Sequence, residues 1–197
     1  MKLDRRQSAK SAPADDIEIR VAARLREARL ARGLTLEQLA ETSGVSRAMI
    51  SRIELGHSSP TAGLLGRLCG GLGLAVSDLF REVETAPSPL ARASEQPVWT
   101  DPATGYLRRS VTPPGSRIDI VHVSLPAGAR VDYPATAYAA GERQIVVLKG
   151  GLEFGNGDAV FRLQRGDCLR IPQRAASWYA NPGAHNVEYL VVYDGAA

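Results

Sequence analysis

The chain has 197 residues, of which 44% are hydrophobic and 23% are charged, and these proportions are those of a folded protein with one large or two small domains. Its net charge is only +3, so nucleic-acid binding cannot be inferred from an overall basic excess. No stretch reaches the roughly 18–20 apolar residues of a membrane span, and the first residues lack the apolar stretch of a signal peptide. We therefore expect a cytoplasmic protein without a membrane segment.

The two cysteines, Cys69 and Cys168, lie far apart and share no metal or redox spacing. We expect both to be buried thiols.

The first 16 residues mix charged residues with Ser, Ala and Pro without periodicity, which predicts a disordered arm over 1–16. From Ile17 to Arg32 apolar residues recur at helical spacing, and Gly33 ends the predicted helix. The next stretch, 35–56, reads as two short helices joined by a tight turn.

These two short helices carry clear capping signals. Thr35 and Gln38 form a capping-box pattern at the start of the first, Gly44 breaks it, and Ser46 caps the second. Beyond them, Thr61 caps a fourth helix that should stop in the glycines around 70–73, and 76–80 indicates a short closing helix.

The second of the two short helices separates into two faces, because residues three and four apart are neighbours on a helix surface. Ile50 and Ile53 point inward. The opposite face carries two arginines, which can bind guanine, a serine for base or phosphate, and an alanine that permits close approach. This pattern indicates a helix that reads the DNA major groove, although a merely solvated outer face would look similar. The residues of this face are Arg47, Ala48, Ser51 and Arg52.

Residues 17–80 resemble the Xre/Cro family of phage-repressor helix-turn-helix proteins. The resemblance rests on Leu-Arg-Glu-Ala-Arg-Leu-Ala-Arg-Gly-Leu-Thr-Leu-Glu-Gln-Leu-Ala, then Ser-Gly-Val-Ser, then Ile-Ser-Arg-Ile-Glu-Leu-Gly. It implies binding to double-stranded operator DNA and an inward Glu54 paired with Arg29. The DNA-binding residues that we expect are Thr35, Gln38, Ser46, Arg47, Ala48, Ser51, Arg52, His57 and Ser58.

Residues 82–97 contain three prolines and almost no apolar pattern, which predicts a linker between a helical domain over 17–81 and a second domain over 98–197. The second domain has eight short β-type runs separated by turns that contain Gly and Pro, as in an all-β sandwich or barrel. The runs are Tyr106–Thr112, Arg117–Leu125, Gln144–Leu148, Leu152–Phe154, Ala159–Leu163, Cys168–Ile171, Ser177–Ala180 and Val187–Tyr193.

Residues 105–194 resemble the cupin family of small double-sheet barrels, through Leu-Pro-Ala-Gly-Ala-Arg, then Ile-Val-Val-Leu-Lys-Gly-Gly-Leu-Glu, then Gly-Asp-Cys-Leu-Arg-Ile-Pro. Cupin enzymes hold a metal ion with two histidines and a glutamate from the first motif and one histidine from the second. The matching positions have none of these residues, and the remaining histidines, His122 and His185, lie outside the motifs. We therefore expect no metal, no cofactor and no catalytic residue. The residues at the matching positions are Tyr133, Ala135, Thr136, Arg143 and Ser177.

An emptied metal site leaves a concave barrel lined by side chains. Arg143 would project into it, because the alternate residues Ile145 and Val147 are apolar. A buried guanidinium needs an anionic or carbonyl partner, which could be Asp132, Glu142 or a ligand carboxylate. A register shifted by one residue would instead place Arg143 on the surface. The expected ligand-binding residues, with core packing as the alternative, are Tyr133, Tyr138, Arg143, Ser177 and Tyr179.

The sequence therefore predicts an all-α five-helix helix-turn-helix bundle followed by an all-β cupin barrel, a combination that resembles Xre-type regulators with a C-terminal cupin. The resemblance implies a transcriptional regulator whose barrel senses a small-molecule effector, mediates dimerisation, or does both. A homodimer is expected, because one reading helix covers only a few base pairs. The alternatives are a cupin isomerase or dioxygenase tethered to a DNA-binding domain, and a barrel that only dimerises.

Overall fold

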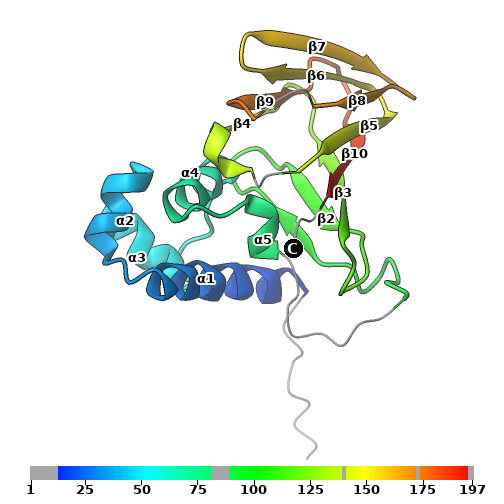
Figure 1. Ribbon diagram of the computed structural model, residues 1–197. Coiled ribbons are helices and arrows are strands. Elements are labelled where there is room, and N and C mark those ends of the chain that lie inside the picture. The colour runs from blue at the N-terminus through cyan, green and yellow to red at the C-terminus, as the bar shows by residue number, and fades with distance from the viewer. Residues whose placement is uncertain (1–12, 81–88, 139–140, 172–173, 195–197) are drawn as a thin grey trace, which may run out of the picture.

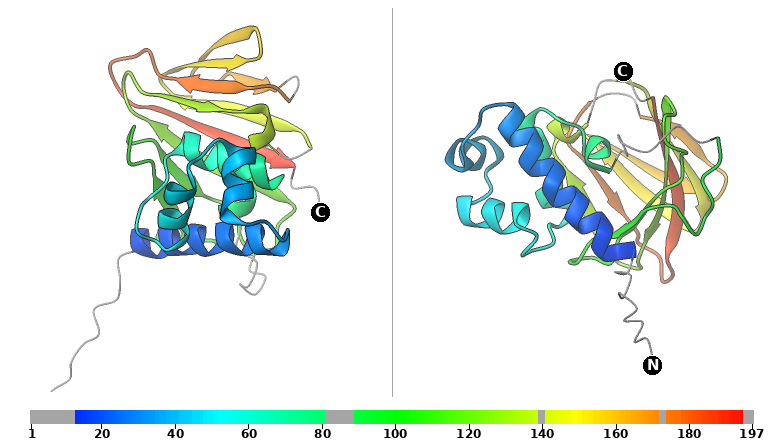
Figure 2. Two further views of the ribbon diagram at one scale, coloured as in Figure 1. Left: turned by 90° about the vertical axis from the view of Figure 1, so that its left-hand side faces the viewer. Right: turned by 90° about the horizontal axis from the view of Figure 1, so that it is seen from below.

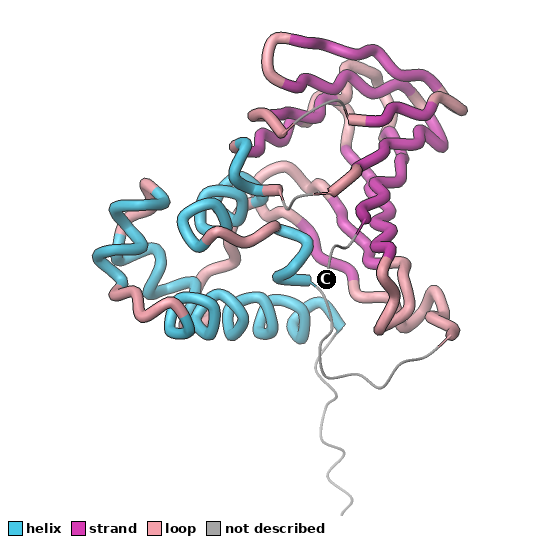
Figure 3. The backbone as a smooth tube through the Cα atoms, viewed as in Figure 1, coloured by secondary structure: helices cyan, strands magenta, loops and turns pink. Residues whose placement is uncertain are grey.

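The computed structural model describes residues 13–80, 89–138, 141–171 and 174–194. In these ranges a group of helices is followed by two antiparallel sheets, so the predicted fold class is confirmed (Figure 1). The helices gather on one side of the molecule and the strands on the other (Figure 3). No helix in the described part of the chain is both long enough and apolar enough to span a membrane.

The first helix begins at Pro13 rather than at Ile17, so residues 13–16 are helical and do not belong to the expected arm. Apolar periodicity marks only the turns that bury side chains, and it misses a polar first turn that opens with a proline, a residue type favoured there. Residues 1–12 of the predicted arm lie outside the described ranges. The helices are α1 (Pro13–Ala31), α2 (Leu36–Ser43), α3 (Arg47–Glu54), α4 (Ala62–Leu72) and α5 (Val76–Phe80).

The predicted caps of α2 and α3 are present. Thr35 Oγ1 accepts a hydrogen bond from the Gln38 N–H at 3.2 Å, and Gln38 Oε1 accepts one from the Thr35 N–H at 2.8 Å. Gly44 ends α2 with a φ of 65°, a conformation that glycine adopts without strain. Ser46 caps α3 through its hydroxyl oxygen. The turn between the helices is therefore fixed by local hydrogen bonds.

The fourth helix ends among the glycines around 70–73, as predicted. It continues through Gly70 and Gly71 to Leu72, and Gly73 closes it with a φ of 63°. A Cβ at Gly70 would overlap the hydroxyl of Thr136 in the 3-10 helix η1 (Ala135–Ala137). Gly73 is thus the residue that ends the helix, whereas Gly70 serves close packing between the two domains.

The β domain has two layers. One sheet has the strand order β1-β2-β3-β10-β5-β8 and the other the order β4-β9-β6-β7, and all pairs are antiparallel. The strands are β1 (Val98–Thr100), β2 (Leu107–Ser110), β3 (Ile118–Leu125), β4 (Arg130–Tyr133), β5 (Arg143–Lys149), β6 (Gly151–Asn156), β7 (Ala159–Gln164), β8 (Cys168–Arg170), β9 (Ser177–Ala180) and β10 (Val187–Asp194).

All eight predicted strands are present, with ends that differ by at most two residues. The strands β1 and β4 were missed, because β1 is very short and β4 carries Arg130 and Asp132, which have little preference for strands. The expectation of two buried thiols is correct for Cys69 and wrong for Cys168, which is exposed on the edge strand β8.

The two domains pack directly on each other. The ring of Phe80 in α5 lies 5.7 Å from that of Trp99 in β1. The guanidinium carbon of Arg108 lies 4.2 Å from the centroid of the Phe80 ring. The helices α2 and α3 lie on the side away from the strands, as Figure 1 and the right-hand view of Figure 2 show. Part of the predicted linker, 82–88, lies outside the described ranges, and 89–97 has neither helix nor strand.

We expect Gly70→Ala to destabilise the full-length protein. Overpacking against Thr136 costs about 1–3 kcal/mol, which exceeds the roughly 1 kcal/mol that alanine adds to helix propensity. Chemical denaturation measures the difference. The matched control is Gly63→Ala in the same helix, where the new Cβ would meet only the Asp132 carbonyl oxygen at 3.8 Å. This control should be neutral or stabilising, and an equal gain in both variants would contradict close packing at Gly70.

Candidate functional site

The outer face of α3 is built as the spacing predicted. Ile50 and Ile53 are each only 1% exposed and pack into the core. Arg47 and Arg52 are exposed on the other side, and Ser51 is half-buried. The fourth member of the face, Ala48, is also exposed, and its short side chain allows a partner to approach the helix closely. A partner that approaches α3 therefore meets two guanidinium groups on a helix with a fixed orientation.

The remaining predicted DNA-binding residues surround this face. Thr35 and Ser46 are exposed and begin α2 and α3, where backbone N–H groups favour an anion. Gln38 is also exposed, but its side-chain oxygen is already used in the cap of α2. His57 is exposed and Ser58 half-buried in the loop after α3.

Sequence analysis missed one member of this surface. Glu37, in the first turn of α2, forms an ion pair with Arg47, with Oε1 2.5 Å from Nε. The two side chains are 63% and 66% exposed, so water screens the pair and its stabilisation is small. No short-range spacing rule links positions 37 and 47, and only the turn between the helices brings them together.

The predicted pairing of Glu54 with Arg29 is confirmed. Nε and Nη2 of Arg29 each donate to a carboxylate oxygen of Glu54 at 2.7 Å, and Nη1 donates to the carbonyl of Leu34 at 2.8 Å. The side chains are 10% and 5% exposed. The hydrogen bond to Glu54 is the main cause that raises the pKa of Arg29. This charged pair ties α3 to α1.

In the β domain, Arg143 points inward, so the alternative of a shifted register is wrong. It is 5% exposed, and its guanidinium carbon lies 3.6 Å from the centroid of the Tyr138 ring. Its Nη1 is buried without a hydrogen-bond partner among the described residues. The two acidic residues offered as partners are engaged elsewhere: Asp132 with Arg130 at 2.7 Å and Glu142 with Arg170 at 3.7 Å.

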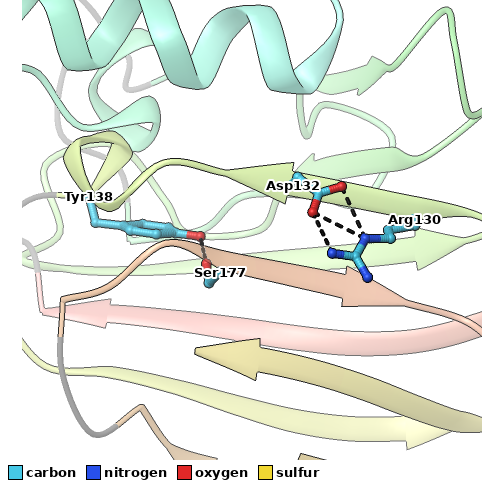
Figure 4. Close-up of polar contacts among 4 residues, drawn as sticks. All are labelled: Arg130, Asp132, Tyr138 and Ser177. Atoms are coloured by element: carbon cyan, nitrogen blue, oxygen red, sulfur yellow. Dashed lines mark hydrogen bonds and ion pairs between the residues drawn. The ribbon is translucent and has the colours of Figure 1, made fainter. Parts of the chain in front are cut away.

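The predicted ligand-binding residues come together around Arg143. The ring of Tyr133 lies 5.9 Å from that of Tyr138 and 6.1 Å from that of Tyr179. The Tyr138 hydroxyl forms a hydrogen bond with Ser177 on β9, whereas Asp132 faces Arg130 instead (Figure 4). All five candidates therefore belong to one buried group.

Sequence analysis missed the other half of this group. All six tyrosines of the chain line one small chamber of about 30 Å³. Arg108 of β2 also lines it, is 6% exposed, and has an Nη1 without a hydrogen-bond partner in the described part of the chain. We call these six residues the tyrosine cluster: Tyr106, Tyr133, Tyr138, Tyr179, Tyr189 and Tyr193.

The tyrosine cluster presents protonated phenols. Burial raises the pKa of Tyr138 to about 12, against the opposing effects of its hydrogen bond to Ser177 and the charge of Arg143. Burial also raises the pKa of Tyr193, while the charges of Arg108 and Arg143 lower it. Tyr193 thus feels both arginines. Phenol and guanidinium N–H and O–H donors together suit an oxygen-bearing anion.

The residues at the cupin metal positions do not fit a divalent ion. A guanidinium cannot act as a ligand, and Tyr133, whose pKa burial raises well above its usual value, is a neutral phenol at pH 7. Across 13–80, 89–138, 141–171 and 174–194, no group of three or more His, Cys, Asp or Glu side chains could hold a metal ion.

Comparison with known proteins agrees with this architecture. Residues 25–89 match the family model HTH_3, described as helix-turn-helix. The helical domain is therefore similar to this family, and the match ends before the first strand. The chain is 25% identical to the HTH-type transcriptional regulator SutR of Escherichia coli (strain K12) over 166 residues, which cover 84% of this chain and 89% of SutR.

One solved structure shows the same fold over most of the chain. A crystal structure of an HTH_3 family transcriptional regulator from Vibrio cholerae aligns with a TM-score of 0.70 and 24% identity, covering 93% of this chain and 99% of that one. Hydroxypropylphosphonic acid epoxidase from S. wedmorenis aligns less well, with a TM-score of 0.47 and 16% identity over 89% of this chain and 97% of that one. The full-length likeness to the regulator includes both domains.

We expect Glu54→Ala to destabilise the helix-turn-helix domain by about 3 kcal/mol or more, because the buried Arg29 guanidinium would lose its carboxylate partner. Thermal and chemical denaturation measure the loss. The matched control is Glu37→Ala, which breaks an exposed pair and should cost about 0.5 kcal/mol or less. An unchanged melting temperature for Glu54→Ala would show that the ion pair is not needed for the fold.

Proposed function

We propose that the protein is a sequence-specific DNA-binding transcriptional regulator that reads the major groove with α3. The observation that carries the proposal is the exposed face with Arg47 and Arg52, on a helix held to α1 by the pair of Arg29 and Glu54. The name of SutR, an HTH-type transcriptional regulator, supports the same function. A reading helix must be held rigidly, because base contacts depend on its exact orientation.

Each predicted residue has a role in this proposal. Arg47 and Arg52 contact bases, Ser51 assists them, and Ala48 lets the helix approach the groove. The phosphate contacts come from the cap residues Thr35 and Ser46, from Gln38 in the first turn of α2, and from His57 and Ser58 in the loop after α3. Glu37 must release Arg47 when DNA binds, and its exposed ion pair is weak enough to break.

We propose that the regulator binds DNA as a homodimer, because one reading helix covers only a few base pairs. The helices α2 and α3 lie away from the β domain, so two copies joined through their β domains would leave both reading helices free to reach one duplex (Figure 2).

The β domain is proposed to sense a small organic ligand that carries a carboxylate. Arg143 is the proposed anchor, because its buried Nη1 has no partner in the described residues and its neighbours are hydrogen-bond donors. Tyr133, Tyr138, Tyr179 and Ser177 complete the site. The alternatives are a cupin-type enzyme and a barrel that only dimerises, and the poor fit of its residues to a metal ion speaks against the usual cupin chemistry.

We expect Arg47→Ala to weaken binding to the operator by about 1–3 kcal/mol and binding to random DNA much less. Sequencing the DNA that the purified protein retains supplies the operator, and titrations with both DNAs give the two losses. The matched control is Arg162→Ala, on an 81% exposed side chain of β7, which should change neither affinity. Equal losses on both DNAs would make Arg47 a phosphate contact.

We expect Arg143→Leu to abolish stabilisation by the effector while the barrel stays folded and DNA binding is kept. A thermal-shift screen of metabolites identifies the effector, which should add about 2.7 kcal/mol at 100 times its Kd. The matched control is Arg170→Leu, whose guanidinium is 73% exposed on the neighbouring strand, and it should respond as wild type. If Arg143→Leu unfolds while Arg143→Lys folds and shows no change in response, the arginine has a structural role only.

A further inference from the structure

A second and larger cavity lies where the two domains meet. It has a volume of about 590 Å³, which is within the range of small-molecule sites. Its walls come from α5, from the segment that precedes β1, and from β2, β3 and the loop between them. Most of the lining is apolar, including Phe80, Leu90, Pro97, Pro113, Pro114 and Ile120. An occupant would therefore need an apolar body.

Arg108 is the cationic residue of this lining. The side chain is 6% exposed, and its Nη1 has no hydrogen-bond partner within the described residues. It lies against the Phe80 ring, but contact with a ring face leaves the N–H groups at the edge of a guanidinium without acceptors. Such a buried donor is costly unless an acceptor meets it. Because Arg108 borders the cavity, the polar group that this wall would bind best is an anionic oxygen.

Two carboxylates limit the charge of the occupant. Glu95 is exposed and Asp119 is half-buried, and both line the cavity. Asp119 of β3 also lies opposite Tyr193 of β10, whose partner on the other side, in β5, is Arg143. Because these acids disfavour a second negative charge, the best match is a molecule with a single carboxylate beside Arg108 and an uncharged apolar remainder.

We propose that the cavity at the domain junction binds an apolar monocarboxylate whose carboxylate is held by Arg108. Arg108 also lines the tyrosine chamber, but the proposed cavity is a separate space from that chamber, and only the regulatory consequence of this inference rests on the proposed function. Phe80 and Ser77 belong to the last helix of the helix-turn-helix domain, while Arg108 and Ile120 belong to the β domain. A bound molecule therefore bridges the two domains and stabilises their docked arrangement.

The test uses 3-phenylpropionate as the probe, with acetate and the neutral 3-phenylpropanamide as matched probes that lack the apolar body or the charge. On the full-length protein we expect 3-phenylpropionate to raise the melting temperature and to slow amide exchange in α5 several-fold. Acetate and the amide should bind at least tenfold more weakly. Equal binding of the amide, or no binding of 3-phenylpropionate up to about 10 mM, where a ligand with a Kd near 1 mM is mostly bound, overturns the proposal.

Variants locate the site. Arg108→Gln should abolish the response, whereas Arg143→Leu and the exposed control Arg162→Gln should keep it. If Arg108→Gln does not fold, Ser110→Phe gives a second test, because it fills the cavity and leaves Arg108 in place. Binding that survives in Arg108→Gln or Ser110→Phe but is lost in Arg143→Leu would overturn this proposal and support the barrel site. Loss of DNA binding without loss of probe binding would contradict the proposed function alone.

Discussion

The ion pair between Arg29 and Glu54 is the interaction on which the position of α3 depends. It joins the end of α1 to the end of α3, and the third guanidinium nitrogen donates to the Leu34 carbonyl in the loop before α2. Three segments of the chain thus meet at one side chain. Because both partners are largely buried, water cannot replace either of them, and the geometry of the helical hairpin follows from their contact.

Local signals in the sequence predicted the helical domain well. The caps at Thr35, Ser46 and Thr61 are formed by hydrogen bonds within four residues, so they can be recognised without knowledge of the fold. The inward direction of Arg143 was also indicated by the sequence, because Ile145 and Val147 are apolar and lie on the same face of the same strand. In both cases the information lies in neighbouring residues.

Contacts between distant segments could not be predicted in this way. Arg108 is buried although the residue before it on β2, Leu107, is apolar. From the sequence alone, the face that carries Leu107 would be expected to be the buried one, and Arg108 lies on the opposite face. The close approach of Gly70 to Thr136 depends on how the domains dock, and a helical glycine by itself indicates only weak propensity. The tyrosine cluster is similar, since its members come from separate strands and turns and share no spacing.

The interior of the β domain carries side chains of a different chemical kind from those of a cupin metal site. Where cupin enzymes present neutral or anionic ligands to a cation, this interior presents two guanidinium groups and six phenols. The preferred charge of an occupant is thereby inverted. The fold accommodates these residues because the sheets are held by backbone hydrogen bonds and by apolar residues such as Leu125, Val147 and Val187, which line neither cavity.

The two glycines of α4 that pack against the β domain, Gly66 and Gly70, have an implication for protein engineering. Gly66 lies against Tyr133 and Pro134, and Gly70 lies against Thr136. The surfaces of α4 and of the β domain are therefore closely complementary at these two glycines. A helix-turn-helix domain with larger side chains at these two positions would not pack against this β domain without a shift of the backbone. Chimaeras that aim to redirect the protein to new operators should therefore exchange α2 and α3 alone and retain the native α4.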